Sequence, residues 1–334
     1  MTTRLNIGLI GVGRMGRVYA NDLAFRVPNA RLTAVADQRA DAAAAVAAEC
    51  GVPKHYGSHH ELLADKEIDA VVIITSTHTH GEMVIDAARS RKAIFCEKPI
   101  SLSLDEAEKM VKVVESAGVF FQMGFQRRFD SGYLGAKKTI EAGTIGTPVV
   151  FKSTSRDPFP PPLEFCNPKV SGGLIVDMGI HDFDVARMFM GDVKSVFANG
   201  CTLAYPEMKK VGDIDNAVVN MVFKSGALGS VDLSRNAVFG YDIRAEILGT
   251  KGAVQVGYHR HTPILVMTQS GITHDVVPHF MERFESAYLA QIRDFVDRVL
   301  NGRQPSITGG DAIASLRISL AATRSLKEGQ PVEV

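Results

Sequence analysis

A glycine-rich segment directly behind a short apolar run constrains the fold of this chain more than any other feature. Residues 5–10 have the apolar character of a buried strand, Gly11-Val-Gly-Arg-Met-Gly16 comes next, and a helical stretch follows. A second apolar run, residues 31–36, ends at Asp37, which stands 21 residues after Gly16. A G-x-G-x-x-G pattern alone is weak. In this order, however, the strand, the helix and the acidic strand end predict a dinucleotide-binding βαβ unit.

Each glycine of this segment has its own expected role. Gly11 permits a tight turn, Gly13 lets backbone N–H groups approach a pyrophosphate, and Gly16 allows the helix to pack closely. The N-terminus of that helix favours negative charge. We therefore expect Arg14 and Met15, which open the helix, to bind the dinucleotide phosphates together with the glycines. The alternative is a purely structural glycine turn.

Asp37 is expected to select the cofactor. Its carboxylate should accept hydrogen bonds from the adenosine ribose hydroxyls and repel a 2′-phosphate, which favours NAD over NADP. Arg39 could instead pair with that phosphate, so NADP stays an alternative, as does a simple turn aspartate.

The pattern of apolar runs changes along the chain and predicts two domains. At about 150 residues per domain, 334 residues are enough for two. Up to residue 125, apolar runs alternate with helical stretches, which predicts a doubly wound parallel sheet in a Rossmann domain. Residues 126–334 should form an α+β domain for substrate binding and oligomerisation, with an open-faced, mainly antiparallel sheet. Helices are expected at 133–141, 177–190, 283–300 and 309–326, and the final one could pack back on the first domain.

Composition favours a small-molecule partner in the cytoplasm. Basic and acidic residues both number 37, so the net charge offers no broad attraction to nucleic acid or to an anionic membrane. The four cysteines form no C-x-x-C pair, which fits reduced thiols in the cytosol. No apolar run approaches the ~18 residues of a membrane helix, and the first residues leave no room for a signal sequence.

A polar segment follows the apolar run at 68–75. Open α/β sheets bind ligands at the ends of their strands, so Thr75, Ser76, Thr77 and His80 should pass beside the cofactor. His78 and His80 form an H-x-H pair, but a metal site needs three or four converging ligands. We therefore expect no metal here, nor at His259-Arg-His261, which is interpreted as a solvated turn.

Glu97-Lys98-Pro99 also follows a strand end, so Lys98 should project toward the same edge of the sheet. A cis bond between Lys98 and Pro99 is compatible with this pattern. The ammonium group could stabilise a developing alkoxide or relay a proton. The alternative is a surface lysine that happens to precede a proline.

Asp177 and His181 are spaced to share one face of a helix that follows Gly172-Gly173. A histidine can take a proton from a substrate hydroxyl near neutral pH, and the aspartate can orient it or bind another hydroxyl. A nicotinamide cofactor takes the hydride but not the hydroxyl proton, so a dehydrogenase needs such a group. The alternative is a hydrogen bond on the helix surface.

These segments resemble the Gfo/Idh/MocA oxidoreductases over essentially the whole chain, and within that family the inositol 2-dehydrogenases. The segments that carry the resemblance are Gly11–Gly16, Thr75–His80, Phe95–Pro99, Gly124–Asp130, and Gly172 to Asp177, His181, Asp182 and Asp184. The resemblance implies a Rossmann domain with an open-faced sheet domain and NAD(P) bound across the crevice. It also implies that His181 is the general acid/base, that Lys98 contacts the reacting oxygen and that Asp177 holds substrate hydroxyls.

The resemblance extends to the ligand contacts. It implies that Glu97, Lys98, Gln126 and Arg127 contact the cofactor. The implied substrate contacts are Lys98, Gln126, Ser155, Asp157, Asp177, His181 and Tyr241. The sequence departs from the family pattern at Ser76-Thr77, where a proline is frequent, and at Ser155 and Asp157, where some inositol dehydrogenases carry imidazole and amide groups.

Those departures leave several substrates open. Myo-inositol is the first candidate substrate, and scyllo-inositol, chiro-inositol and an aldose are alternatives, because mismatched hydroxyls at a buried site change substrate preference strongly. Two other functions stay open, an NADP-linked sugar reductase and a non-catalytic sensor. Family members commonly form dimers or tetramers through the outer face of the second sheet. We expect a homo-oligomer, most simply a tetramer, with Val218, Met221 and Val231 on that face.

Overall fold

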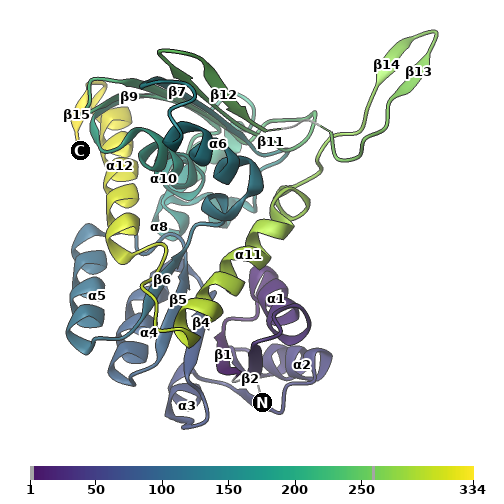
Figure 1. The fold of residues 1–334 in the computed structure, drawn as a ribbon, viewed down its shortest axis with the longest axis vertical. Coiled ribbons are helices and arrows are strands. Elements are labelled where there is room, and N and C mark those ends of the chain that lie inside the picture. Colours follow the sequence, from purple (N-terminus) through teal and green to yellow (C-terminus); the bar gives the residue numbers. More distant parts are fainter. Residues whose placement is uncertain (1–3, 258–259) are drawn as a thin grey trace. The chain divides into compact units, whose positions relative to one another are not determined.

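The computed structural model describes residues 4–257 and 260–334 and divides the chain into two compact units. The first unit comprises the chain up to Gln126 together with Ser286–Ile313, and the second comprises Arg127–Glu285 and Ala314–Val334. The chain therefore passes between the units three times, at 126/127, 285/286 and 313/314. Helix α11 (Phe280–Leu300) and helix α12 (Gly309–Glu328) each contribute to both units (Figure 1).

The first unit is built on a six-stranded sheet in the order β3-β2-β1-β4-β5-β6, in which every neighbouring pair is parallel. Its elements are β1 (Leu5–Ile10), α1 (Arg14–Asn21), β2 (Ala30–Ala36), α2 (Ala40–Cys50), β3 (Lys54–Tyr56), α3 (His59–Ala64), β4 (Ala70–Ile73), α4 (Thr77–Arg89), β5 (Ala93–Glu97), α5 (Leu104–Ala117) and β6 (Phe121–Gly124). All residues of β4 are buried, as expected of a parallel strand covered on both faces. The predicted doubly wound sheet is confirmed.

The strand order places a switch point between β1 and β4. From β1 the chain runs outward to β2 and β3, then returns to β4 on the other side of β1. Because the strands are parallel, the segments after β1 and β4 leave the sheet at the same edge, where such sheets bind ligands. The helix predicted after the glycines ends at Asn21 and continues as a π-helical segment, Asp22–Arg26.

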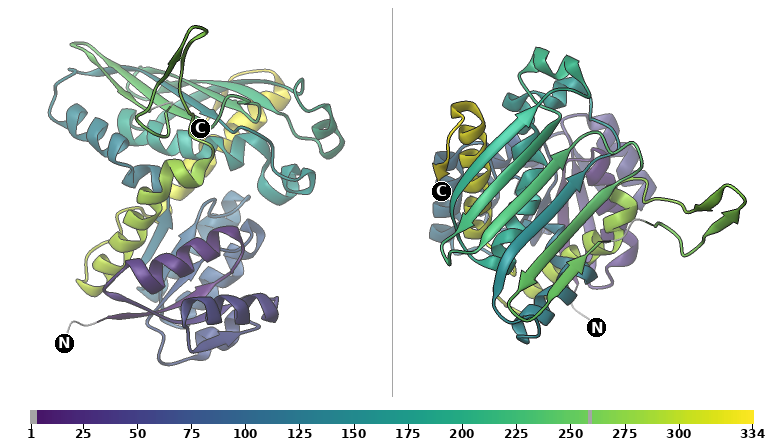
Figure 2. Two further views of the ribbon diagram at one scale, coloured as in Figure 1. Left: turned by 90° about the vertical axis from the view of Figure 1, so that its right-hand side faces the viewer. Right: turned by 90° about the horizontal axis from the view of Figure 1, so that it is seen from above.

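The second unit contains a seven-stranded sheet in the order β12-β11-β7-β10-β9-β8-β15. Strands β7 and β10 are parallel, and the other pairs are antiparallel. Its elements are α6 (Ser131–Glu141), β7 (Pro148–Arg156), α7 (Leu163–Cys166), α8 (Pro168–Ser171), α9 (Gly173–Asp177), α10 (Gly179–Met190), β8 (Val193–Cys201), β9 (Asn216–Phe223), β10 (Leu228–Ser234), β11 (Asp242–Gly249), β12 (Ala253–Val256), β13 (Val266–Thr268), β14 (Gly271–Thr273) and β15 (Val332–Glu333). The predicted open-faced sheet is confirmed, because α9 and α10 lie on one face and the other face is in open view in Figure 2.

Along β9, residues alternate between the helix-covered face and the open face of this sheet. In β9, Val218 is exposed, whereas Met221 is buried. Val231 of β10 is also buried, since it pairs with the inward-facing Val219. The expectation that Met221 and Val231 lie on the outer face is therefore wrong, and only Val218 lies there. Successive side chains of a strand point to opposite faces, so Met221, three positions after Val218 in β9, lies on the other face.

Across the part of the chain that the structure describes, none of the helices is both long enough and apolar enough to cross a membrane. The four cysteines, Cys50, Cys96, Cys166 and Cys201, are free thiols in the structure.

Candidate active site

The loop after β1 has the geometry of a phosphate cradle. Gly11 has φ +95°, and a side chain there would collide with the carbonyl oxygen of Ile74. A side chain at Gly16 would collide with the carbonyl of Gly11, so the helix packs as closely as expected. At Gly13, by contrast, an added Cβ would meet no described atom within 4 Å. The loop therefore leaves open space at the glycine where a pyrophosphate is expected to approach.

The N-terminus of α1 begins at this loop. Its N-cap is Gly13, and no side chain among the described residues caps the helix. The first N–H groups of a helix have no partner within it, and they attract an anion. The donor set of the loop and of Arg14 and Met15 thus fits the pyrophosphate of a dinucleotide.

Asp37 is held rigidly at the end of β2. Its Oδ2 accepts a hydrogen bond from the Val12 N–H at 2.9 Å, and its Oδ1 accepts one from the Arg39 N–H at 3.0 Å. The Arg39 side chain lies 3.7 Å from the same carboxylate. Each carboxylate oxygen can accept a further bond, so the group is preset to receive ribose hydroxyls.

The segment after β4 is tied to the segment after β5 by His80, which is buried. Its Nδ1 lies 2.8 Å from the carbonyl oxygen of Pro99, and its Nε2 lies 3.2 Å from that of Thr75. Burial lowers the pKa of His80. Both ring nitrogens face backbone carbonyl oxygens, so His80 positions the backbone of Thr75, with Ser76 and Thr77 opening α4. His259 lies outside the described residues.

Lys98 stands at the end of β5 on a backbone fixed by its neighbour Glu97. The Lys98 N–H donates to Glu97 Oε2 at 3.1 Å, and the Lys98-Pro99 bond is cis. Glu97 Oε1 accepts from the Tyr19 hydroxyl and from Gln291 Nε2, the latter at 3.3 Å. Burial raises the pKa of Glu97, and these hydrogen bonds oppose the rise. Sequence reasoning missed Tyr19 and Gln291, which belong to distant helices.

Asp177 and His181 do not share one continuous helix as predicted. Asp177 is the last residue of α9, Met178 interrupts the helix, and His181 lies in the first turn of α10. The helix predicted for residues 177–190 is therefore corrected to one that starts at Gly179. Asp177 belongs to the separate short helix α9, which precedes it.

A buried arginine missed in the sequence holds Asp177. Arg235 follows β10, is 1% exposed, and places Nη2 at 3.4 Å from Asp177 Oδ2 and 4.0 Å from Asp213 Oδ2. Burial raises the pKa of Asp213. The only sequence signal was a charged residue directly behind a strand of the second sheet.

Arg127 and Ser155 belong to one buried network. Arg127 donates to Asp182 Oδ1 at 2.8 Å and to Ser155 Oγ at 2.9 Å, and Ser153 Oγ donates to the same Asp182 oxygen at 2.5 Å. Arg128 makes two hydrogen bonds to Asp184. Both aspartates stand on α10, so the network holds the helix that carries His181.

The remaining predicted substrate residues differ in exposure. Tyr241 is buried, and this burial, with the Asp157 carboxylate as the next cause, raises the pKa of Tyr241 well above its usual value. Gln126 is buried, and its Oε1 has no hydrogen-bond partner among the described residues. A buried amide oxygen of this kind suits a ligand donor.

Taken unit by unit, the candidate residues form a nucleotide-binding edge in the first unit and, in the second, two successive short helices, α9 with Asp177 and α10 with His181. Residues 5–125 match a family described as "Oxidoreductase family, NAD-binding Rossmann fold", and residues 137–334 match "Oxidoreductase family, C-terminal alpha/beta domain". The chain belongs to this Gfo/Idh/MocA oxidoreductase family, and the resemblance seen in the sequence is confirmed.

Named relatives are similar over the full length. The chain is 41% identical to a scyllo-inositol 2-dehydrogenase (NAD(+)) of Bacillus subtilis, covering 100% of this chain and 97% of the relative. It is 42% identical to a myo-inositol 2-dehydrogenase of Thermotoga maritima, covering 99% and 98%. The fold matches a crystal structure of scyllo-inositol dehydrogenase from Lactobacillus casei with bound NAD(H) and scyllo-inositol, with a TM-score of 0.94, 30% identity and 99% of each chain covered.

Proposed function

We propose that this protein oxidises a secondary hydroxyl of a cyclic polyol to a ketone with NAD. The first candidate substrate is myo-inositol, which would be converted to 2-keto-myo-inositol. The observation that carries the proposal is full-length similarity, at 41% and 42% identity, to two inositol 2-dehydrogenases. The open phosphate cradle and the fixed Asp37 support NAD as the cofactor.

Residues 1–125 are proposed as the cofactor-binding domain, whose compact unit also includes Ser286–Ile313, and the rest of residues 126–334 as the domain that binds substrate and forms the oligomer. The proposed cofactor contacts are Gly11, Gly13, Arg14, Met15, Gly16, Asp37, Thr75, Ser76, Thr77, His80, Glu97, Lys98, Gln126 and Arg127. His80 and Glu97 would act through the backbone that they hold, since their polar side-chain atoms already bond to protein groups. The free thiols are compatible with work in the cytoplasm.

Three side chains are proposed to manage the proton and the charge on the reacting oxygen. His181 takes the proton from the hydroxyl, because an imidazole changes its charge near neutral pH. Lys98 stabilises the negative charge that develops on that oxygen. Asp177, itself held by Arg235, binds a neighbouring hydroxyl and orients the imidazole. NAD supplies the hydride acceptor.

The choice among polyols is proposed to lie with Asp157 and Tyr241. Ser155 already accepts a hydrogen bond from Arg127, so its hydroxyl is partly engaged within the protein. Asp157 and Tyr241 would offer an acceptor and a hydroxyl to the substrate. A site that bonds substrate hydroxyls rejects an isomer that leaves those groups unpaired.

A substrate screen tests the function directly. With NAD, kcat/KM for at least one of myo-, scyllo- and chiro-inositol should exceed that for aldohexoses by about a hundredfold or more, because unpaired buried groups disfavour the wrong substrate. NAD should also be preferred to NADP, since the Asp37 carboxylate would repel a 2′-phosphate. The measurement is NADH absorbance under steady-state conditions. Absence of turnover with all three inositols would contradict the proposal.

The open face of the second sheet is proposed as a contact between copies of this chain, most simply in a tetramer. Four apolar residues stand side by side across four strands of this face: Val222 pairs with Leu228, Leu228 with Val150, and Val150 with Leu248. Leu228 is 54% exposed and Leu248 is 44% exposed. A contiguous apolar row of this kind is typical of an interaction surface.

Light scattering at micromolar concentration should therefore give a mass near four chains. Leu228→Glu should shift the mass toward smaller species, because a charge would be buried in the contact. Leu203→Glu, at an exposed apolar residue outside the sheets, is the matched control and should leave the mass unchanged. A wild-type monomer, or equal effects of the two substitutions, would refute the contact.

A further inference from the structure

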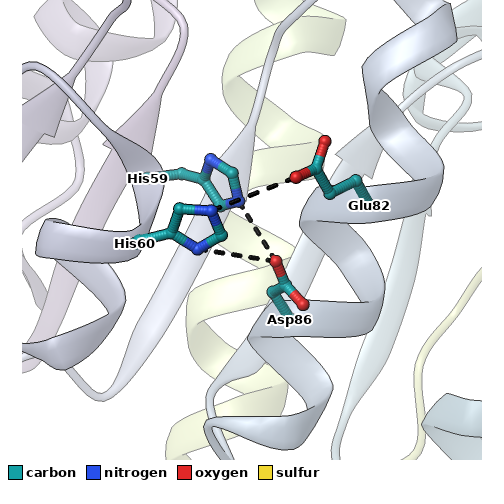
Figure 3. Close-up of side chains that lie close together, drawn as sticks. All are labelled: His59, His60, Glu82 and Asp86. Atoms are coloured by element: carbon teal, nitrogen blue, oxygen red, sulfur yellow. Dashed lines mark hydrogen bonds and ion pairs between the residues drawn. The ribbon is translucent and has the colours of Figure 1, made fainter.

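Two histidines and two carboxylates of the first unit converge on one point outside the nucleotide-binding edge. His59 and His60 open α3, and Glu82 and Asp86 stand one turn apart on α4 (Figure 3). Each offers one donor atom, and these atoms all lie within 4.8 Å of one another. The sequence patterns considered above, His78-x-His80 and the segment at 259–261, did not include these residues, because the donors come from two separate helices.

The distances between donors are close to those of a metal site. His59 Nε2 lies 3.3 Å from Asp86 Oδ2, His60 Nδ1 lies 3.6 Å from the same oxygen, and His60 Nε2 lies 4.0 Å from Glu82 Oε1. Bonds of about 2.0–2.2 Å at tetrahedral angles place neighbouring donors of Zn²⁺ about 3.3–3.5 Å apart. His60 binds an ion through only one of its two nitrogens, and the four donor atoms lie within 4.8 Å of one another, so the exposed His60 and Glu82 side chains must rotate to enclose a cation.

Exposure and charge also suit a cation. The His60 and Glu82 side chains are 63% and 65% exposed, so an ion can enter and these chains can adjust, whereas His59 is 10% and Asp86 22% exposed. The two imidazole rings lie side by side, with their centroids 3.9 Å apart. Arg89 approaches the other oxygen of Asp86, at 3.6 Å, and leaves Oδ2 directed at the histidines.

We infer that His59, His60, Glu82 and Asp86 bind one divalent transition-metal ion of the zinc type, which joins α3 to α4. The two imidazole nitrogens favour Zn²⁺, which also accepts carboxylate oxygens, over Ca²⁺ or Mg²⁺, which prefer all-oxygen sites. The ion holds two helices that neighbour the β4 segment and takes no part in the proposed reaction. The inference does not depend on the proposed substrate.

Calorimetric titration of the metal-free, untagged full-length protein with ZnCl₂ tests the site. We expect one Zn²⁺ per chain. His60→Ala and Glu82→Gln should each weaken binding at least about tenfold, since even outer-shell partners of metal ligands are worth 10- to 100-fold in affinity. His55→Ala, at an exposed histidine outside the cluster, is the matched control and should bind as the wild type does. Zn²⁺ should also raise the melting temperature of the wild type more than that of either cluster variant.

Two results would overturn the inference. One is the absence of saturable Zn²⁺ binding in the wild type; the other is binding that both cluster variants retain in full, which would put the ion elsewhere. In that case the four residues are an ion-paired contact between α3 and α4 only. His60 and Glu82 are exposed, so both variants should fold, and equal melting temperatures in EDTA verify this.

Discussion

Replacement of His181 by Asn is expected to lower kcat for inositol oxidation by about 10²- to 10⁴-fold, the usual contribution of a positioned general base. Asn keeps a polar side chain of similar size at a site that is 9% exposed, so the fold should persist. Affinity for NAD should stay near the wild-type value, because His181 belongs to the second unit and the phosphate cradle to the first. Stopped-flow or steady-state NADH formation measures the first quantity, and fluorescence titration with NADH the second.

The control is His274→Ala, which removes an exposed histidine of the same unit and should leave kcat unchanged. The pH profile gives a separate readout. Wild-type oxidation should weaken at acid pH as the imidazole becomes protonated and can no longer accept the hydroxyl proton. The residual activity of the Asn variant should lack that limb. Turnover that is unchanged in this variant would remove His181 from the mechanism.

Asp182→Ala is expected to lower the free energy of unfolding by about 3–5 kcal/mol, because it leaves a buried arginine without its counter-ion. Arg127 and Asp182 are 2% and 0% exposed, and the same carboxylate oxygen accepts from Ser153. Removing one partner of a buried pair costs far more than the pair contributes relative to an apolar replacement. Urea denaturation followed by circular dichroism measures the change.

The matched control is Asp232→Ala in the Arg156–Asp232 pair, whose side chains are 33% and 36% exposed. Water screens that pair, so its loss should cost no more than about 1 kcal/mol. If the two substitutions destabilise the protein equally, burial does not govern the effect and the account given for Asp182 fails.

Local pattern was enough to predict most of the fold. The glycine loop, the apolar run at 68–75 and the strands of the second sheet carry their signal within a few residues. Strand β3, with three residues, and helix α3, with six, are too short for periodicity to show. The interruption at Met178 gave no signal because neither Gly nor Pro stands at that position.

The candidate site was predictable where a local pattern reveals it, at strand ends and at the spacing of Asp177 and His181. Asp37 and Lys98 were found because each directly follows a strand. Their partners were not, since a hydrogen bond such as that between Gln291 and Glu97 joins residues 194 positions apart. Arg235 is a further case, because nothing in its local sequence indicates a buried side chain that reaches Asp177.

The return of residues 286–313 to the first unit has a consequence for synthesis on the ribosome. Gln291 bonds to Tyr19, Phe295 packs against Phe95 with ring centroids 5.7 Å apart, and the Met123 N–H donates to the carbonyl of Ile307. These partners emerge only after nearly the whole polypeptide has been translated. The nascent segment up to Gln126 must therefore wait, with aromatic surface uncovered, until residues 286–313 arrive to complete the unit.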